Sequence, residues 1–73
     1  MGLEKIINLL NKLKIKYAKA KVLNKTEITI LDRNIKIRVD GNQMIYIDDE
    51  GYYSLPINES TLTFLENILN AEE

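Results

Sequence analysis

The chain has 73 residues, of which 45% are hydrophobic and 29% are charged, a composition typical of one small folded domain over residues 1–73. It contains no cysteine and no histidine, which excludes disulfides and thiolate metal sites and removes the commonest metal-binding and acid–base side chain. We therefore expect no catalytic residues, no cofactor and no metal site. A core of this size supplies only about 3–5 kcal/mol, so we expect stabilisation by a partner, either a second copy or another protein.

The sequence contains no apolar run near the roughly 20 residues that cross a bilayer. Its first residues include Glu4 and lack the apolar segment of a secretory signal. We expect a cytoplasmic protein without membrane contact. The eleven isoleucines and eight lysines indicate an AT-rich or thermophilic source.

The net charge of −1 conceals two halves of opposite sign. Residues 1–38 hold all ten basic side chains against three acidic ones, a net charge of +7. Residues 39–73 hold eight acidic side chains and no basic one, a net charge of −8. The favoured interpretation is that these charges neutralise each other, within one fold or head to tail between copies. The second interpretation is a basic surface for nucleic acid.

An amphipathic helix is predicted first in the chain. Apolar residues recur over residues 3–15 at the spacing of one helical face, and neither proline nor glycine interrupts this segment. These apolar positions are Leu3, Ile6, Ile7, Leu10 and Leu13.

From Lys16 onward the hydrophobic period changes to two, the period of a strand with one buried face. Clusters of turn residues separate the alternating runs, and loops this short join sequential antiparallel neighbours. An antiparallel meander of four to five strands follows. The runs lie at residues 16–22, 28–30, 35–39, 44–47 and 52–55.

Helical spacing returns after Pro56, and Asn58 or Ser60 can cap a second helix. The predicted fold class is therefore α+β, with an N-terminal helix, the meander and a C-terminal helix, and with both helices on one face of the sheet. The alternative is a small β-barrel capped by helices. The apolar stripe of the second helix is Leu62, Leu65, Ile68 and Leu69, with Phe64 at its edge.

The hairpin registers decide which residues share a face of the sheet. A three-residue loop at residues 40–42 would place Ile37 opposite Ile45 and keep Ile45 and Ile47 in the core. A two-residue turn at residues 40–41 would turn both isoleucines outward and create a sheet that is apolar on both faces, which would require a covering partner. We favour the three-residue loop because burying two isoleucines is worth roughly 3–6 kcal/mol.

In that register, small and β-branched residues face the helices. The expected inner residues are Ala18, Ala20, Val22, Ile28, Ile30, Ile35, Ile37, Val39, Ile45, Ile47, Tyr53 and Leu55. The expected outer residues are Lys19, Lys21, Thr29, Leu31, Lys36, Arg38, Met44, Tyr46 and Tyr52.

This outer face supports two function classes. The favoured one is a non-catalytic interaction module that self-associates or serves as an accessory subunit or inhibitor of a larger protein. The alternative is a nucleic-acid-binding module in which basic side chains meet phosphates and Tyr46 stacks on a base. The acidic half of the chain argues against tight, non-specific coating of DNA, because a segment with a net charge of −8 repels phosphate unless it faces away. The candidate interface or nucleic-acid-binding residues are Lys19, Lys21, Lys36, Arg38, Met44, Tyr46 and Tyr52.

Overall fold

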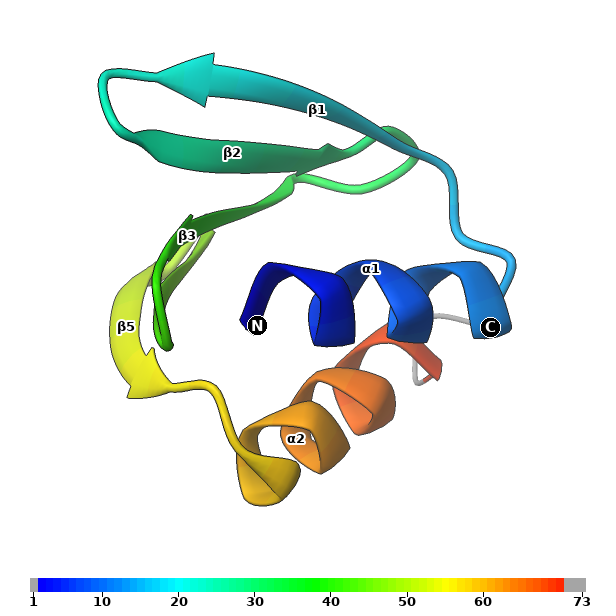
Figure 1. The fold of residues 1–73 in the computed structure, drawn as a ribbon. Helices are drawn as coiled ribbons and strands as arrows, with labels where there is room; N and C mark the ends of the chain where they lie inside the picture. Colours follow the sequence, from blue (N-terminus) through cyan, green and yellow to red (C-terminus); the bar gives the residue numbers. More distant parts are fainter. Residues whose placement is uncertain (1, 71–73) are drawn as a thin grey trace.

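A computed structural model describes residues 2–70 and shows a helix, a five-stranded antiparallel sheet and a second helix (Figure 1). The strands follow one another in the order β1-β2-β3-β4-β5, so the sheet is an open meander with β1 and β5 at its edges. The predicted α+β fold is confirmed, and the sheet does not close into a barrel. The elements are α1 (Gly2–Lys12), β1 (Tyr17–Val22), β2 (Lys25–Ile30), β3 (Ile35–Asp40), β4 (Gln43–Asp48), β5 (Gly51–Pro56) and α2 (Glu59–Asn70).

Both helices pack on one face of the curved sheet, which we call the inner face; the opposite face is the outer face (Figure 1). The core lies between the helices and the inner face, where the apolar stripes of both helices meet the isoleucines of β2 and β3. Neither helix within residues 2–70 is long and apolar enough to cross a membrane. The buried apolar residues are Ile6, Leu9, Leu10, Ile28, Ile30, Ile35, Ile37, Val39, Met44, Tyr46, Ile57, Leu65 and Leu69.

The helix ends are closed by side-chain and backbone caps. Asn58 caps α2 as predicted, because its Oδ1 accepts a hydrogen bond from the Thr61 backbone N–H at 3.0 Å. The Thr61 hydroxyl in turn donates to the carbonyl oxygen of Pro56 at 2.6 Å, which ties the start of α2 to the end of β5. These bonds hold α2 beside the edge strand.

The β3–β4 hairpin differs from the predicted register. Its turn has two residues, Gly41 and Asn42, so that Met44 lies opposite Val39 and Tyr46 lies opposite Ile37. Met44 and Tyr46 are therefore buried, at 1% and 3% exposure. Ile45 and Ile47 point to the outer face and are half-buried there. The prediction that Ile45 and Ile47 fill the core is wrong.

Turn geometry and aromatic packing explain this register. Gly41 has a φ of 63° as the first turn residue, and Asn42 has no positive φ, a combination that suits a type II′ turn with glycine first. The buried ring of Tyr46 stacks on Tyr53 at a centroid distance of 6.1 Å and meets Phe64 edge-on at 5.9 Å. A favourable turn and a large buried ring together outweigh the burial of two isoleucines.

Strand β1 also shows the face opposite to the predicted one. Lys19 pairs with Ile28 and Lys21 with Thr26, so both lysines lie on the inner-face side and the small residues at 18, 20 and 22 lie on the outer face. All of residues 18–22 are exposed, and burial therefore gives this strand no preference between the faces. The deciding contact is Tyr17, which is half-buried against the core opposite Ile30.

Strands β2, β3 and β5 place their residues on the predicted faces of the sheet, but the cross-strand partners in the β2–β3 and β4–β5 hairpins differ from the predicted ones. The loop between β2 and β3 has four residues, 31–34, and Ile28 consequently pairs with Ile37. Strand β5 turns Tyr53 and Leu55 to the inner face as predicted, although Tyr53 remains 52% exposed there.

Candidate functional site

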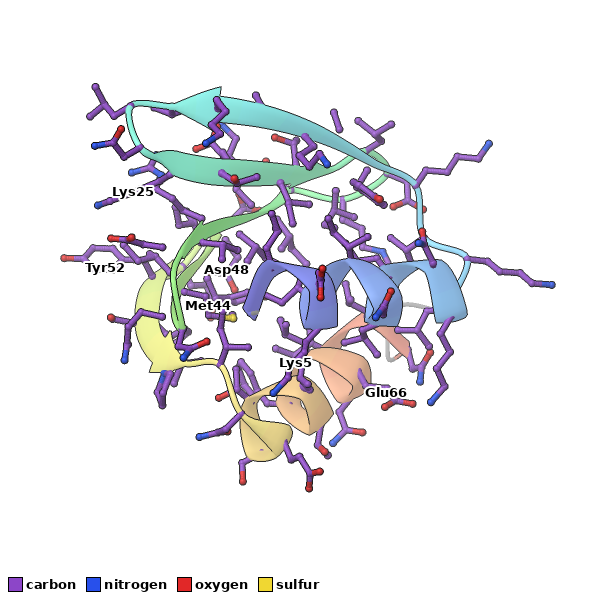
Figure 2. All side chains as sticks on the ribbon, viewed as in Figure 1. Lys5, Lys25, Met44, Asp48, Tyr52 and Glu66 are labelled. Atoms are coloured by element: carbon purple, nitrogen blue, oxygen red, sulfur yellow. The ribbon has the colours of Figure 1, made fainter. Side chains whose placement is uncertain are left out.

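The predicted site residues do not form one surface. Lys36, Arg38 and Tyr52 lie on the outer face as expected, whereas Met44 and Tyr46 are buried in the core. Figure 2 shows Tyr52 pointing away from the outer side of the sheet and the sulfur of Met44 pointing toward the helices. The basic surface with a stacking Tyr46, which was predicted for nucleic acid, is not assembled.

The outer face is partly apolar, and the guanidinium of Arg38 on this face already forms an ion pair. Ile45 and Ile47 are half-buried on it, beside Arg38 and Lys36 respectively. The guanidinium of Arg38 contacts the carboxylate of Glu27, its neighbour across β2 and β3, at 2.9 Å. Arg38 is therefore already engaged in an ion pair within the chain.

Four lysines form what we call the basic edge, at the β1 side of the sheet. Lys19 and Lys21 are exposed on this edge strand, and Lys16 is exposed just before it. Lys25 extends outward beside the β1–β2 turn (Figure 2). None of the four forms an ion pair with another side chain in residues 2–70. The members of the basic edge are Lys16, Lys19, Lys21 and Lys25.

A groove of about 980 Å³ opens on the inner face between β5 and α2. Tyr46 lies at its base, with Tyr53 and Phe64 against it. Tyr53 is 52% exposed and Phe64 38% exposed, so ring surface faces solvent within the groove. Exposed aromatic side chains are enriched at protein interfaces and attract cationic groups to their faces.

Three carboxylates border one end of the groove, and we call them the acid rim: Asp48, Asp49 and Glu50 at the β4–β5 turn. Asp48 accepts a hydrogen bond from the Glu50 backbone N–H at 2.9 Å, and Asp49 accepts one from the side-chain amide of Asn34. No basic side chain of the described chain pairs with them. The acid rim therefore presents three negative charges beside exposed rings.

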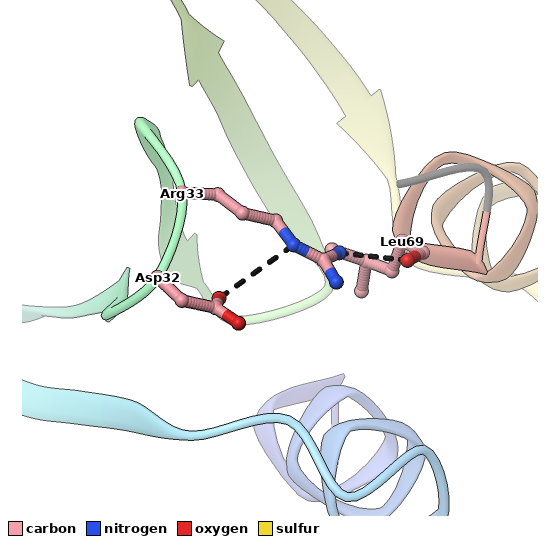
Figure 3. A network of polar contacts seen from close by, with 3 residues as sticks. All are labelled: Asp32, Arg33 and Leu69. Carbon is pink, nitrogen blue, oxygen red and sulfur yellow. Dashed lines mark hydrogen bonds and ion pairs between the residues drawn. The ribbon is translucent and has the colours of Figure 1, made fainter. Parts of the chain in front are cut away.

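Arg33 connects the β2–β3 loop to the end of α2, as Figure 3 shows. Its Nη1 donates to the carbonyl oxygen of Leu69 at 2.7 Å, and its Nε lies 3.6 Å from the carboxylate of Asp32. A cation at the negative end of a helix dipole is stabilising, and the side chain is only 15% exposed. The one basic residue that lines the groove is thus engaged in structure.

The groove was not predicted from the sequence, and Tyr53 was expected on the inner face of the sheet among the core residues. The available signal was Phe64 at the edge of the α2 stripe, because a ring in that position covers a sheet only in part.

This arrangement favours noncovalent binding of a cationic group at the groove. No group of three or more acidic side chains in residues 2–70 is arranged to hold a metal ion.

Comparisons of the chain with protein-family models, with curated proteins and with solved structures found no match.

Proposed function

We propose that this protein is a small non-catalytic interaction module that self-associates head to tail, with the basic edge of one copy against the acid rim of the next. One observation carries this proposal: lysines without an ion pair lie along one edge strand of the open sheet, β1, and carboxylates without an ion pair lie at the turn that leads into the other edge strand, β5. Complementary charge of this kind steers association and sets the register of partners.

The geometry of one copy does not join these charges to each other. Strands β1 and β5 lie at opposite ends of the strand order (Figure 1). The three ion pairs within residues 2–70 are Lys12–Glu66, Arg33–Asp32 and Arg38–Glu27, and none of them links the basic edge to the acid rim. A second copy can supply the missing counter-charges. Because the two surfaces differ, the contact is heterologous, and repetition yields rings or open chains.

The nucleic-acid alternative has less support. Tyr46 is buried, Arg38 is paired with Glu27, and Lys36 lies on the face opposite Lys19. Within residues 2–70, the aromatic side chain on the strand of the basic edge is Tyr17, which is half-buried against the core.

A charge-swap experiment tests the proposal. The variant Lys19→Glu/Lys21→Glu carries acidic residues on both surfaces, and the variant Asp49→Lys/Glu50→Lys carries basic residues on both. We expect each variant alone to stay at the 8.5 kDa monomer mass in light scattering, at concentrations where the natural chain associates. An equimolar mixture should associate again, because every contact then joins opposite charges.

The control distinguishes the loss of lysines at the basic edge from the accompanying change in the net charge of the protein. Two Lys→Glu changes lower the net charge from −1 to −5 wherever they lie. Lys5→Glu/Lys36→Glu makes the same change on α1 and on the outer face, and this variant should still self-associate. Circular dichroism establishes that every variant is folded. A natural chain that stays monomeric at all concentrations would show that the lysines of β1 serve only to prevent edge pairing.

A further inference from the structure

We infer that β1 of a second copy adds in parallel to the free edge of β5 and places Lys19 over the exposed rings of Tyr53 and Phe64. This inference rests on the head-to-tail association proposed above and names the contact that makes it. The groove is thereby assigned as the receptor for a lysine-bearing strand of the same chain.

The topology sets the direction of this strand addition. In a five-stranded antiparallel meander, β1 and β5 run in the same direction. A second copy that continues the sheet with its helices on the same side keeps that direction, so its β1 lies parallel to β5. Because side chains alternate between faces, Lys19 and Lys21 then share the inner face with Tyr53 and Leu55.

The charges favour this direction over the reverse one. In the parallel arrangement the start of β1, which follows Lys16, lies beside the start of β5, which follows the acid rim residues Asp49 and Glu50. Antiparallel addition of β1 would require the second copy to turn its helices to the other side. Lys19 would then lie beside Tyr52 on the outer face, and Lys16 would lie far from the acid rim.

The groove has the size and chemistry for a lysine side chain. Its volume of about 980 Å³ exceeds that of one side chain, and Phe64 and Tyr53 present partly exposed rings. A lysine can lay its methylene stem on such rings while its ammonium remains near solvent and near the carboxylates.

Disulfide trapping in the full chain tests this contact, and it is clean because the chain has no cysteine. Lys19→Cys protein is mixed with Tyr53→Cys protein under mild oxidation, and intact mass spectrometry measures the mixed disulfide. The Cα atoms of bridged cysteines lie about 4.4–6.8 Å apart, a range that neighbouring strands satisfy. Lys21→Cys serves as a second partner for a register shifted by two residues. Tyr52→Cys is the matched control, because it adjoins Tyr53 and lies on the outer face.

We expect more mixed disulfide with Tyr53→Cys than with Tyr52→Cys for either lysine position. An excess with Tyr52→Cys would overturn the inference, since it would place β1 with the opposite face inward. Equal yields would also overturn it. In both cases, association in the charge-swapped mixture would show that the proposed head-to-tail function still holds.

A second measurement tests the contact with the rings. Tyr53→Leu keeps an apolar side chain but removes the ring that attracts a cation, so self-association should weaken roughly two- to fivefold in Kd. Tyr52→Leu should leave Kd unchanged. Equal effects of the two substitutions would contradict the assignment of Lys19 to the groove.

Discussion

Within residues 2–70, two residues that are not glycine adopt a left-handed backbone, and both occupy positions where the chain reverses. Lys14, with a φ of 59°, follows α1 in a Schellman motif, in which Ile15 N–H donates to Leu10 C=O at 2.9 Å and Lys14 N–H donates to Asn11 C=O at 3.1 Å. Leu23, with a φ of 60°, begins the β1–β2 turn and is 91% exposed. A side chain with a Cβ costs roughly 1–2 kcal/mol in this conformation, which glycine adopts freely.

Lys14→Gly should therefore raise the free energy of unfolding by about 1 kcal/mol, because it relieves the left-handed backbone at the helix end. Chemical denaturation of the monomer measures this change. Lys14→Ala is the control: it removes the same charge and long side chain but keeps the Cβ, and it should give no such gain. Equal stabilities of the two variants would show that the residue is not strained.

Among the elements, β4 is the one whose orientation the hydrophobic pattern leaves open. Residues 44–47 are all apolar or aromatic, so both faces of the strand read as a core face. The structure buries Met44 and Tyr46 and turns Ile45 and Ile47 outward. This arrangement gives the outer face an apolar centre. It also predicts opposite effects on folding for the same substitution at the adjacent positions Tyr46 and Ile47.

Tyr46→Asp should unfold the domain, because an unpaired carboxylate in the core costs several kcal/mol, which is comparable to the stability of a domain of this size. Ile47→Asp should remain folded, since this position lies on the outer face opposite Lys36, where opposite charges pair favourably across strands. Circular dichroism and thermal melting compare the two. A folded Tyr46→Asp variant beside an unfolded Ile47→Asp variant would show that β4 has the other orientation.

At the scale of the whole molecule, the division of charge along the chain becomes a division across the sheet. The basic half supplies β1 and its lysines, and the acidic half supplies the acid rim and β5. The antiparallel order carries them to opposite edges. One copy therefore has a positive and a negative end, a distribution of charge that suits assembly with further copies.

Association through these ends should depend on salt. At low ionic strength the mass from light scattering should rise above 8.5 kDa with concentration. It should return to the monomer value near 1 M salt, where exposed charges are screened beyond about 3 Å. Association that persists or strengthens in salt would point instead to the apolar outer face around Ile45 and Ile47, because screening does not weaken apolar contacts.

The features predicted correctly depend on residues close together in the chain. The helical stripes of both helices, the cap at Asn58, the alternation in β2 and β3 and the short loops that force a meander are all local patterns. They were sufficient for the element order, the open antiparallel sheet and the side on which the helices lie.

The composition of the surfaces depends on distant contacts. The orientation of β1 follows from Tyr17 against the core, and that of β4 follows from the packing of Tyr46 with Tyr53 and Phe64. The alternation of β1 pointed to the wrong face and that of β4 was compatible with both, and a shift of one residue exchanges the two faces completely. For this reason Lys19 and Tyr46 could be recognised as strand residues from sequence, whereas the basic edge and the groove existed only once the sheet and α2 had packed together.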